Sequence, residues 1–227
     1  MIYRTFLRHQ NDPGETQVDD LNESAEDETA YLSYLEWMRE CLTHLYRIGT
    51  SDSRLCLNVQ ADSGNNDTTH SLYSDILQLA KTVGFQYKSE ITWYQPVYRS
   101  SAFGKGSASS PTIVNPVERI MILYKHQWEK IDNKFSNMGA ESRLLTHGFW
   151  QINLDEQDTS PHLARLPVQI PINLLKLLSY KDDVVLDPFG AAGSVAVAAK
   201  QLGRPFISIE STEHHFETAQ ERLARVA

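Results

Sequence analysis

The order of apolar and polar residues predicts a chain in which helices and strands alternate. Between residues 31 and 48, Leu35, Met38 and Leu42 recur at the spacing of one helix face, and Gly49 follows as a stop signal. Short apolar runs predict buried strands. We therefore expect helices at 31–48, 71–82, 171–179, 193–202 and 213–225, and strands at 54–59, 90–94, 119–124, 184–187 and 206–210. This alternation is typical of βα units, so the predicted fold class is α/β with a mostly parallel sheet.

Three segments lack this periodicity. Residues 10–29 are polar and acidic with few apolar side chains, which predicts a mobile arm or loop. Residues 95–116 are rich in Ser, Gly and Pro, and residues 127–166 are irregular and polar. No internal repeat is visible.

Charge is unevenly distributed along the 227 residues. The formal net charge is −8, and residues 1–40 hold ten acids against three bases. Residues 81–130 hold seven bases against three acids, a local net of +4. An acidic total therefore does not exclude a nucleic-acid partner, because a partner responds to the local field.

The composition excludes several other classes of protein. No run of 18 apolar residues occurs, which predicts no membrane span, and the N-terminus is too short and polar for a secretory signal. Cys41 and Cys56 have no Cys or His at metal-binding spacing, so we expect neither a metal site nor a disulfide framework. A reducing cytoplasm fits this composition best.

The sharpest chemical signal lies between Val184 and Glu210. A strand runs into a turn of small residues that includes Gly190, Ala191 and Gly193, a helix follows, and the next strand ends on the acid. Small residues let the backbone approach a ligand, and the start of a helix offers free N–H groups. An acid at the tip of the neighbouring strand can accept hydrogen bonds from ribose hydroxyls. The pattern indicates a site for an adenosine-bearing cofactor, and its spacing is not the G-x-G-x-x-G of dinucleotide sites.

The residues of this segment resemble those of a known family. The string DPF, followed by small residues, by AAKQLGR and by a last helix containing A-x-x-R-L, is similar to the C-terminal part of the amino-DNA methyltransferases of permuted (beta-class) order. The usual pattern there is D-P-F-x-G-x-G-T. Asp187, Phe189, Gly193 and Ser194 match it, with Ser for Thr, whereas Ala191 replaces the first glycine.

The resemblance covers about residues 30–225. HLARLPVQIP, from His162 to Pro171, resembles the pattern that introduces the helix before the DPF strand, and GFW resembles the aromatic strand ahead of it. Upstream, YLEWMRECLTHLYRIG and RLCLNV resemble the helix and strand that follow the family's catalytic loop. The stretch from ITWYQ to RIMILYK resembles a block with a serine- and glycine-rich loop.

The resemblance implies a Rossmann-like methyltransferase fold, incomplete at the N-terminus, with an irregular DNA-recognition insertion. It implies an enzyme that moves a methyl group from S-adenosylmethionine to the exocyclic amine of cytosine (N4) or adenine (N6) in double-stranded DNA. The expected regions are an acidic arm (1–29), a catalytic half (30–94), a DNA-recognition region (95–147) and a cofactor half (148–227). The implied cofactor residues are Asp187, Phe189, Gly190, Ala191, Gly193, Ser194, Glu210 and His162, and the implied DNA contacts are Arg99, Lys105, Tyr98 and Phe103.

The family's catalytic tetrad is not found. Members carry S, D or N, then P-P and an aromatic, so that the amine's hydrogens are accepted and the flipped base is stacked. No P-P dipeptide occurs in the sequence, and the nearest string is Asn11-Asp12-Pro13-Gly14, so the catalytic residues stay unassigned. We expect the chain to begin after the tetrad, which would leave a strand missing between the DPF strand and RLCLNV. The arm or a second chain could supply that strand.

Two other functions stay open at this point. One is a non-catalytic module that binds S-adenosylmethionine or DNA, which the missing tetrad favours. The other is a nicotinamide-dependent oxidoreductase, which the glycine spacing disfavours. From the missing tetrad we also expect that the 227-residue chain alone transfers no methyl group to DNA at a useful rate.

Overall fold

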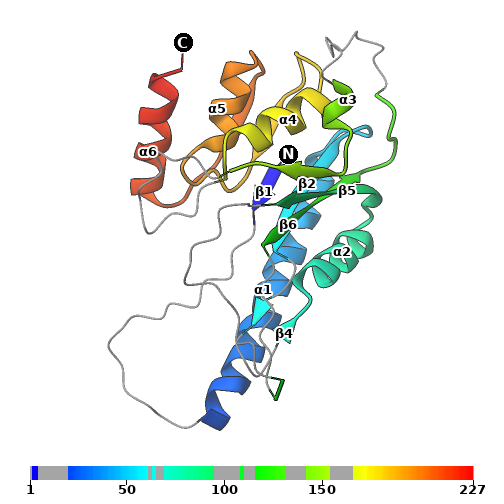
Figure 1. Cartoon of the computed structure of the whole chain (residues 1–227), viewed down its shortest axis with the longest axis vertical. Helices are drawn as coiled ribbons and strands as arrows, with labels where there is room; N and C mark the ends of the chain where they lie inside the picture. Colours follow the sequence, from blue (N-terminus) through cyan, green and yellow to red (C-terminus); the bar gives the residue numbers. More distant parts are fainter. Residues whose placement is uncertain are drawn as a thin grey trace.

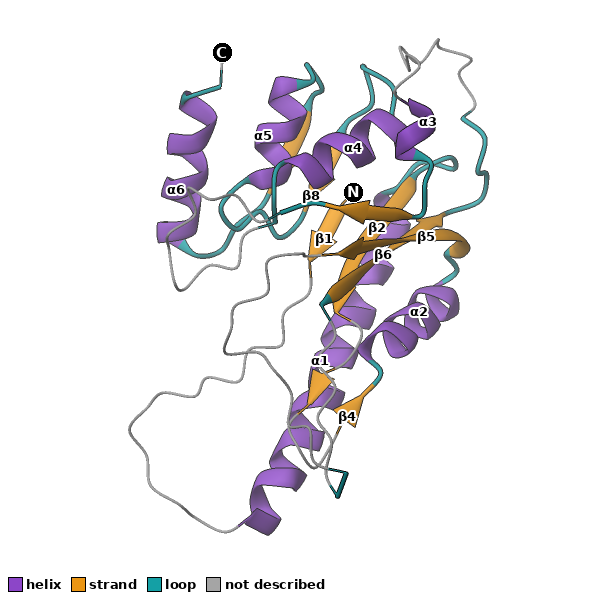
Figure 2. Cartoon of the chain, viewed as in Figure 1, coloured by secondary structure: helices purple, strands orange, loops and turns teal. Residues whose placement is uncertain are grey.

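The computed structural model describes residues 2–4, 20–60, 63–64, 69–94, 108–109, 116–130, 142–153 and 166–226. In this part of the chain, helices flank a five-stranded sheet on both sides (Figure 1). Helices α4, α5 and α6 lie on one side, and α1 and α2 lie on the other (Figure 2).

The five strands follow an order that differs from their order in the sequence. Across the sheet they are β1 (Ile2–Arg4), β2 (Arg54–Gln60), β6 (Val117–Tyr124), β5 (Gln86–Tyr94) and β7 (Phe149–Gln151). A second, parallel pair consists of β8 (Val185–Asp187) and β9 (Phe206–Ser208). The short strands β3 (Ser63–Gly64) and β4 (Thr69–His70) form a small antiparallel pair.

One strand of the larger sheet runs against the others. β1 and β2 are parallel, as are β5 and β7, whereas β6 is antiparallel to both of its neighbours. Four of the five described strands therefore point the same way, which confirms a mostly parallel sheet. The reversal of β6 was not foreseen from the sequence. Its physical basis is that antiparallel neighbours need no crossover helix between them.

The described helices agree with the predicted ones except at the start of the first and at Ser142–Leu145, a short helix within the stretch 127–166 that was expected to be irregular. They are α1 (Asp20–Ile48), α2 (Leu72–Val83), α3 (Ser142–Leu145), α4 (Gln169–Leu178), α5 (Ser194–Gln201) and α6 (Glu213–Ala224). Because α1 begins at Asp20, the prediction of an arm or loop through residue 29 was wrong for this stretch. Polar side chains indicate that a segment is exposed to solvent, but they do not indicate which backbone conformation it adopts. Glu and Ala are good helix formers, and acids near a helix N-terminus interact favourably with the helix dipole.

The strand expected to be missing is partly supplied by the first residues of the chain. β1 pairs with β2 in the register Ile2↔Cys56 to Arg4↔Asn58, and it lies beside β8. β1 therefore lies between β8, which leads into the DPF string, and β2, which contains RLCLNV. At these three positions no second chain is needed, because the arm itself provides the backbone partner.

Successive residues of β2 point to opposite faces of the sheet and pack into two different apolar cores. Leu55 and Leu57 of β2 pack toward α1 and α2, whereas Cys56 between them packs toward α4 and α5. Leu42 of α1 and Ile170 of α4 are fully buried in these two cores. Two-sided burial of this kind is typical of strands in α/β proteins. Among the described residues, no helix is long and apolar enough to cross a membrane.

Candidate cofactor site

The turn between β8 and α5 is tied closely to the end of β9. The N–H of Gly190 donates to the carbonyl of Ile209 over 2.7 Å, and the N–H of Gly193 donates to the carbonyl of Gly190 over 2.7 Å. The first bond of α5 follows at once, from the N–H of Val197 to the carbonyl of Gly193. The predicted small-residue turn therefore lies at the carboxyl edge of the β8–β9 pair, where α/β proteins bind ligands.

Two glycines of this turn lie where an added side chain would meet a neighbouring element. Gly193 has φ +77°, and a Cβ there would lie 2.8 Å from the Cβ of Ala219 on α6. A Cβ at Gly190 would overlap the Oγ of Ser208. Both positions thus let the turn approach β9 and α6, and at Gly193 the left-handed backbone adds a second reason for glycine.

Ala191, which replaces the family's first glycine, also adopts a left-handed backbone. Its φ is +42°, the one positive value among the described non-glycine residues. Its N–H donates to Oε2 of Glu210 over 2.7 Å, and the N–H of Thr212 donates to Oε1 of the same carboxylate over 2.8 Å. These bonds compensate for the backbone strain and hold Glu210 against the turn.

The Asp187 carboxyl is almost completely buried at the end of β8. The residue is 3% exposed, and its Oδ1 accepts a hydrogen bond from the N–H of Phe189 over 3.2 Å. Burial raises the pKa of Asp187 to about 6, and the nearby charge of Glu210 adds to this rise, which the Phe189 N–H opposes. A buried carboxyl with a raised pKa is a candidate for binding a cationic group of a ligand.

The pKa of Glu210 is shifted in the opposite direction to that of Asp187. Its partial burial raises the pKa, but the N–H groups of Thr212 and Ala191, together with His215, more than offset this effect, so the pKa lies below its ordinary value. The Nδ1 of His215 lies 3.8 Å from Oε1 of Glu210. Glu210 is therefore an ionised acceptor close to the turn.

Three supporting residues were not assigned from the sequence. Arg222 of α6 donates to the carbonyl of Ala192 over 2.5 Å and to Oγ of Ser194 over 3.3 Å, which gives the A-x-x-R-L motif a structural role in holding the turn. His215, near the start of α6, is half-buried beside Glu210. Trp37 of α1 lies 5.3 Å from Phe189 between ring centroids, so α1 contacts the turn.

The structure brings together most of the predicted cofactor residues and leaves the others undescribed. Asp187, Phe189, Gly190, Ala191, Gly193, Ser194 and Glu210 all lie in or against the turn. His162, the DNA-contact candidates Arg99, Lys105, Tyr98 and Phe103, and the string that contains Asp12 and Pro13 lie outside the described residues. In the described part of the chain, no cluster of His, Cys, Asp and Glu suits a metal ion.

A small-residue turn at the edge of parallel strands, with an acid on the next strand, is typical of α/β proteins that bind a nucleoside-bearing ligand. The family model described as DNA methylase matches residues 8–221, which is most of the sequence. The chain therefore belongs to the DNA methylase family.

Curated relatives agree with this assignment, and a solved structure has the same fold. The chain is 36% identical over 128 residues to the type II methyltransferase M.MjaVI of Methanocaldococcus jannaschii, which covers 55% of this chain and 66% of the relative. It is 27% identical to M.BglI of Bacillus subtilis, over 73% of this chain and 47% of that protein. TTHA0409 of Thermus thermophilus, a putative DNA modification methylase, has the same fold, with a TM-score of 0.71, 22% identity, and coverage of 86% and 78% of the two chains. The chain thus spans two thirds or less of the length of the two methyltransferase relatives.

Proposed function

We propose that this chain supplies the S-adenosylmethionine-binding half of a DNA amino-methyltransferase. The observation that carries the proposal is the turn from Asp187 to Ser194, with the ionised Glu210 carboxylate held against it. The methyl acceptor would be the exocyclic amine of cytosine or adenine in double-stranded DNA. The TTHA0409 structure compared above is a complex with S-adenosyl-L-methionine, which supports the choice of cofactor.

The residues present fit such a cofactor. The Glu210 carboxylate accepts two backbone N–H groups and a hydrogen bond from the Thr212 side chain, so one of its four acceptor positions remains for a ribose hydroxyl. S-adenosylmethionine has cationic ammonium and sulfonium groups, and the buried Asp187 carboxyl is suited to bind the ammonium group. The tight turn around Gly190 allows the nucleoside to approach the backbone.

The chain's contribution to the reaction would be binding and orientation. When bound, S-adenosylmethionine supplies an electrophilic sulfonium methyl group. Asp187 and Glu210, which lie at the ends of neighbouring parallel strands, would fix its two ends and so hold the methyl at the carboxyl edge of the sheet. Fixing the reacting groups in line lowers the entropic part of the barrier.

Replacing Glu210 by alanine tests this assignment. We expect S-adenosylmethionine and its demethylated product to bind with about 1–3 kcal/mol less free energy, roughly a five- to 150-fold loss of affinity, because the ribose loses a charged acceptor. Isothermal calorimetry measures this loss. The matched control is Glu217→Ala, which removes an exposed acid from α6 and should leave the affinity unchanged. Equal affinity in both variants would refute the role of Glu210.

The residues that would contact DNA, which carries the methyl-accepting amine, stay a prediction. Arg99, Lys105, Tyr98 and Phe103 are proposed to contact DNA through phosphate and stacking interactions. The residues that accept the amine's hydrogens are unassigned, and the chain alone is expected to leave unmethylated DNA at background in a tritiated-methyl assay. Robust incorporation would contradict that expectation and would make Asp12 and Pro13 the first residues to replace.

A further inference from the structure

A tryptophan of α1 lies against the cofactor turn, and the proposed function makes no use of it. Trp37 is 42% exposed, so a large part of its ring is open to solvent. Its ring centroid lies 5.3 Å from that of Phe189 in the turn and 5.9 Å from that of Tyr34, one helical turn earlier in α1. These three rings form an aromatic cluster on the side of the turn that faces α1.

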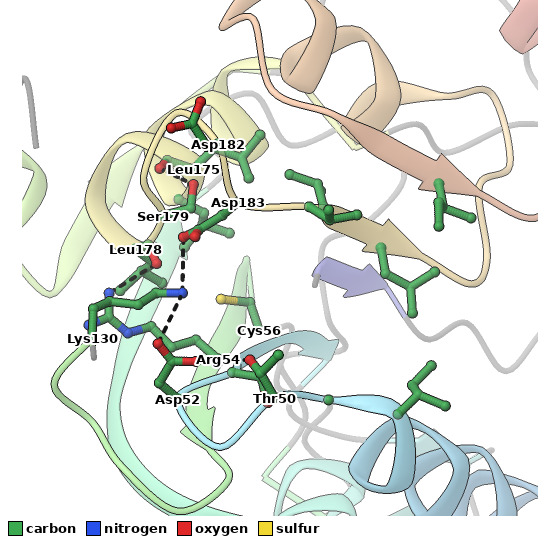
Figure 3. Close-up of a pocket in the computed structure, with 18 residues that line it drawn as sticks. Thr50, Asp52, Arg54, Cys56, Lys130, Leu175, Leu178, Ser179, Asp182 and Asp183 are labelled. Carbon is green, nitrogen blue, oxygen red and sulfur yellow. Dashed lines mark hydrogen bonds and ion pairs between the residues drawn. The ribbon is translucent and has the colours of Figure 1, made fainter. Parts of the chain in front are cut away.

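The aromatic cluster lies toward the carboxyl edge of the sheet. The last residue of α1, Ile48, lines the same pocket as Arg54, the first residue of β2, so α1 ends at the amino edge (Figure 3). Trp37 precedes Ile48 by about three helical turns, roughly 16 Å. The strand β2 extends over about 20 Å from Arg54 to Gln60. Trp37 is therefore level with the carboxyl half of the strands, where the cofactor turn lies.

The cluster lies beside the middle of the proposed ligand rather than beside either of its ends. Asp187, which is proposed to bind the ammonium group, comes two residues before Phe189. Ala191, whose N–H holds the Glu210 carboxylate, comes two residues after it. Phe189 thus lies between the positions that would fix the ammonium and the ribose. In S-adenosylmethionine, the group between these two ends is the positively charged sulfonium.

An exposed tryptophan ring is suited to face such a charge. Cations are attracted to the faces of aromatic rings, and tryptophan attracts them most strongly. The chain already contains such contacts at Trp128, where Cζ of Arg54 lies 4.4 Å and Nζ of Lys88 lies 4.9 Å from the centre of the ring. In the part of the chain that the structure describes, no Lys or Arg faces the Trp37 ring in this way.

We propose that Trp37 contacts the sulfonium group of S-adenosylmethionine and so favours this methyl donor over S-adenosylhomocysteine, the product, whose sulfur is uncharged. The inference rests on the proposed function, which supplies the ligand. Both ligands carry the same ribose and ammonium groups, so the hydrogen bonds of Glu210 and Asp187 are common to the two. The contact between the ring and the cation is made with the donor alone, and it reduces the competition of product with donor for the site.

Calorimetry with the two ligands, above pH 7, tests this role. We expect Trp37→Leu to weaken the binding of S-adenosylmethionine about three- to thirtyfold more than that of S-adenosylhomocysteine, because the ring that faces the charge is removed. Trp37→Phe keeps a smaller aromatic face and should shift the ratio of the two dissociation constants less, in the same direction. The matched control is Trp128→Phe, which changes a ring near the amino edge of the sheet and should leave the ratio as in the parent.

Tryptophan fluorescence supplies a second measurement on the same proteins. Trp93 and Trp150 are buried in the core beneath α4, and Trp128 lies beside Arg54. S-adenosylmethionine should therefore change the emission of the parent and of Trp128→Phe, and most of this change should be lost in Trp37→Phe.

The outcomes separate this inference from the proposed function. If Trp37→Leu weakens both ligands equally, or weakens neither, Trp37 does not contact the sulfonium, while the binding of both ligands to the parent still supports the cofactor site. If Trp37→Leu does not fold, the ratio and the emission of Trp37→Phe decide in the same way. If the parent binds neither ligand, the proposed function is wrong and the role of Trp37 is wrong with it.

Discussion

Substitution of Gly193 by alanine is expected to lower the free energy of unfolding by about 2–4 kcal/mol. A left-handed backbone costs a residue with a Cβ about 1–2 kcal/mol, and Gly193 has φ +77°. The added Cβ would also lie 2.8 Å from the Cβ of Ala219, and such overpacking costs about 1–3 kcal/mol. Urea unfolding followed by circular dichroism measures the change.

Gly148→Ala is the matched control for this substitution. Gly148 is exposed, and a Cβ there would lie 3.6 Å from the carbonyl of Glu90, an ordinary contact. We expect its effect to stay within about 0.5 kcal/mol. If the two variants unfold at the same urea concentration, the turn between β8 and α5 is not packed against α6 as described.

Substitution of Asp187 by asparagine is expected to change stability and ligand affinity in opposite directions. The folded pKa of about 6 lies above the ordinary value of 3.8, so the folded protein binds this proton more tightly than the unfolded chain does. The parent therefore loses stability from this group as the pH rises from about 4 to about 6. Asparagine has no proton to lose. The variant should match the parent near pH 4 and exceed it by about 2–3 kcal/mol above pH 7.

The ligand should show the reverse effect. The ionised Asp187 carboxylate is proposed to bind the ammonium group of S-adenosylmethionine, so the variant should bind the cofactor about ten- to hundredfold more weakly above pH 7. The parent's affinity should fall as the pH drops below about 6, and the variant's should not follow it. Glu210 does not account for such a fall, because its pKa is lowered and it stays ionised. Parallel pH profiles for parent and variant would contradict the role of Asp187.

The turn was predictable because its residues are constrained by local physics. A strand, small residues at fixed spacing and a following helix leave few backbone solutions, and the acid on the next strand must then lie at the same edge. The glycines of the turn also allow it to pack closely against β9 and α6, which no single sequence reveals. The contact of Gly193 with Ala219 joins residues far apart in the chain and depends on how α6 packs.

The parts that sequence reasoning missed depend on long-range pairing. The polar composition before residue 30 predicts an arm, whereas α1 begins at Asp20 and β1 pairs with β2 in the main sheet. Strand direction is not encoded in a short apolar run, so the reversal of β6 could not be predicted from RIMILY. The contact between Trp37 and Phe189 likewise arises only when α1 packs against the turn that follows β8.

The most direct test of the cofactor assignment is calorimetric titration of the 227-residue chain with S-adenosylhomocysteine and, separately, with NAD. The turn at Asp187–Ser194 and the Glu210 carboxylate predict one binding site per chain for S-adenosylhomocysteine and no measurable binding of NAD, whose pyrophosphate requires the G-x-G-x-x-G spacing that this chain lacks. Binding of NAD together with no heat from S-adenosylhomocysteine would contradict the account.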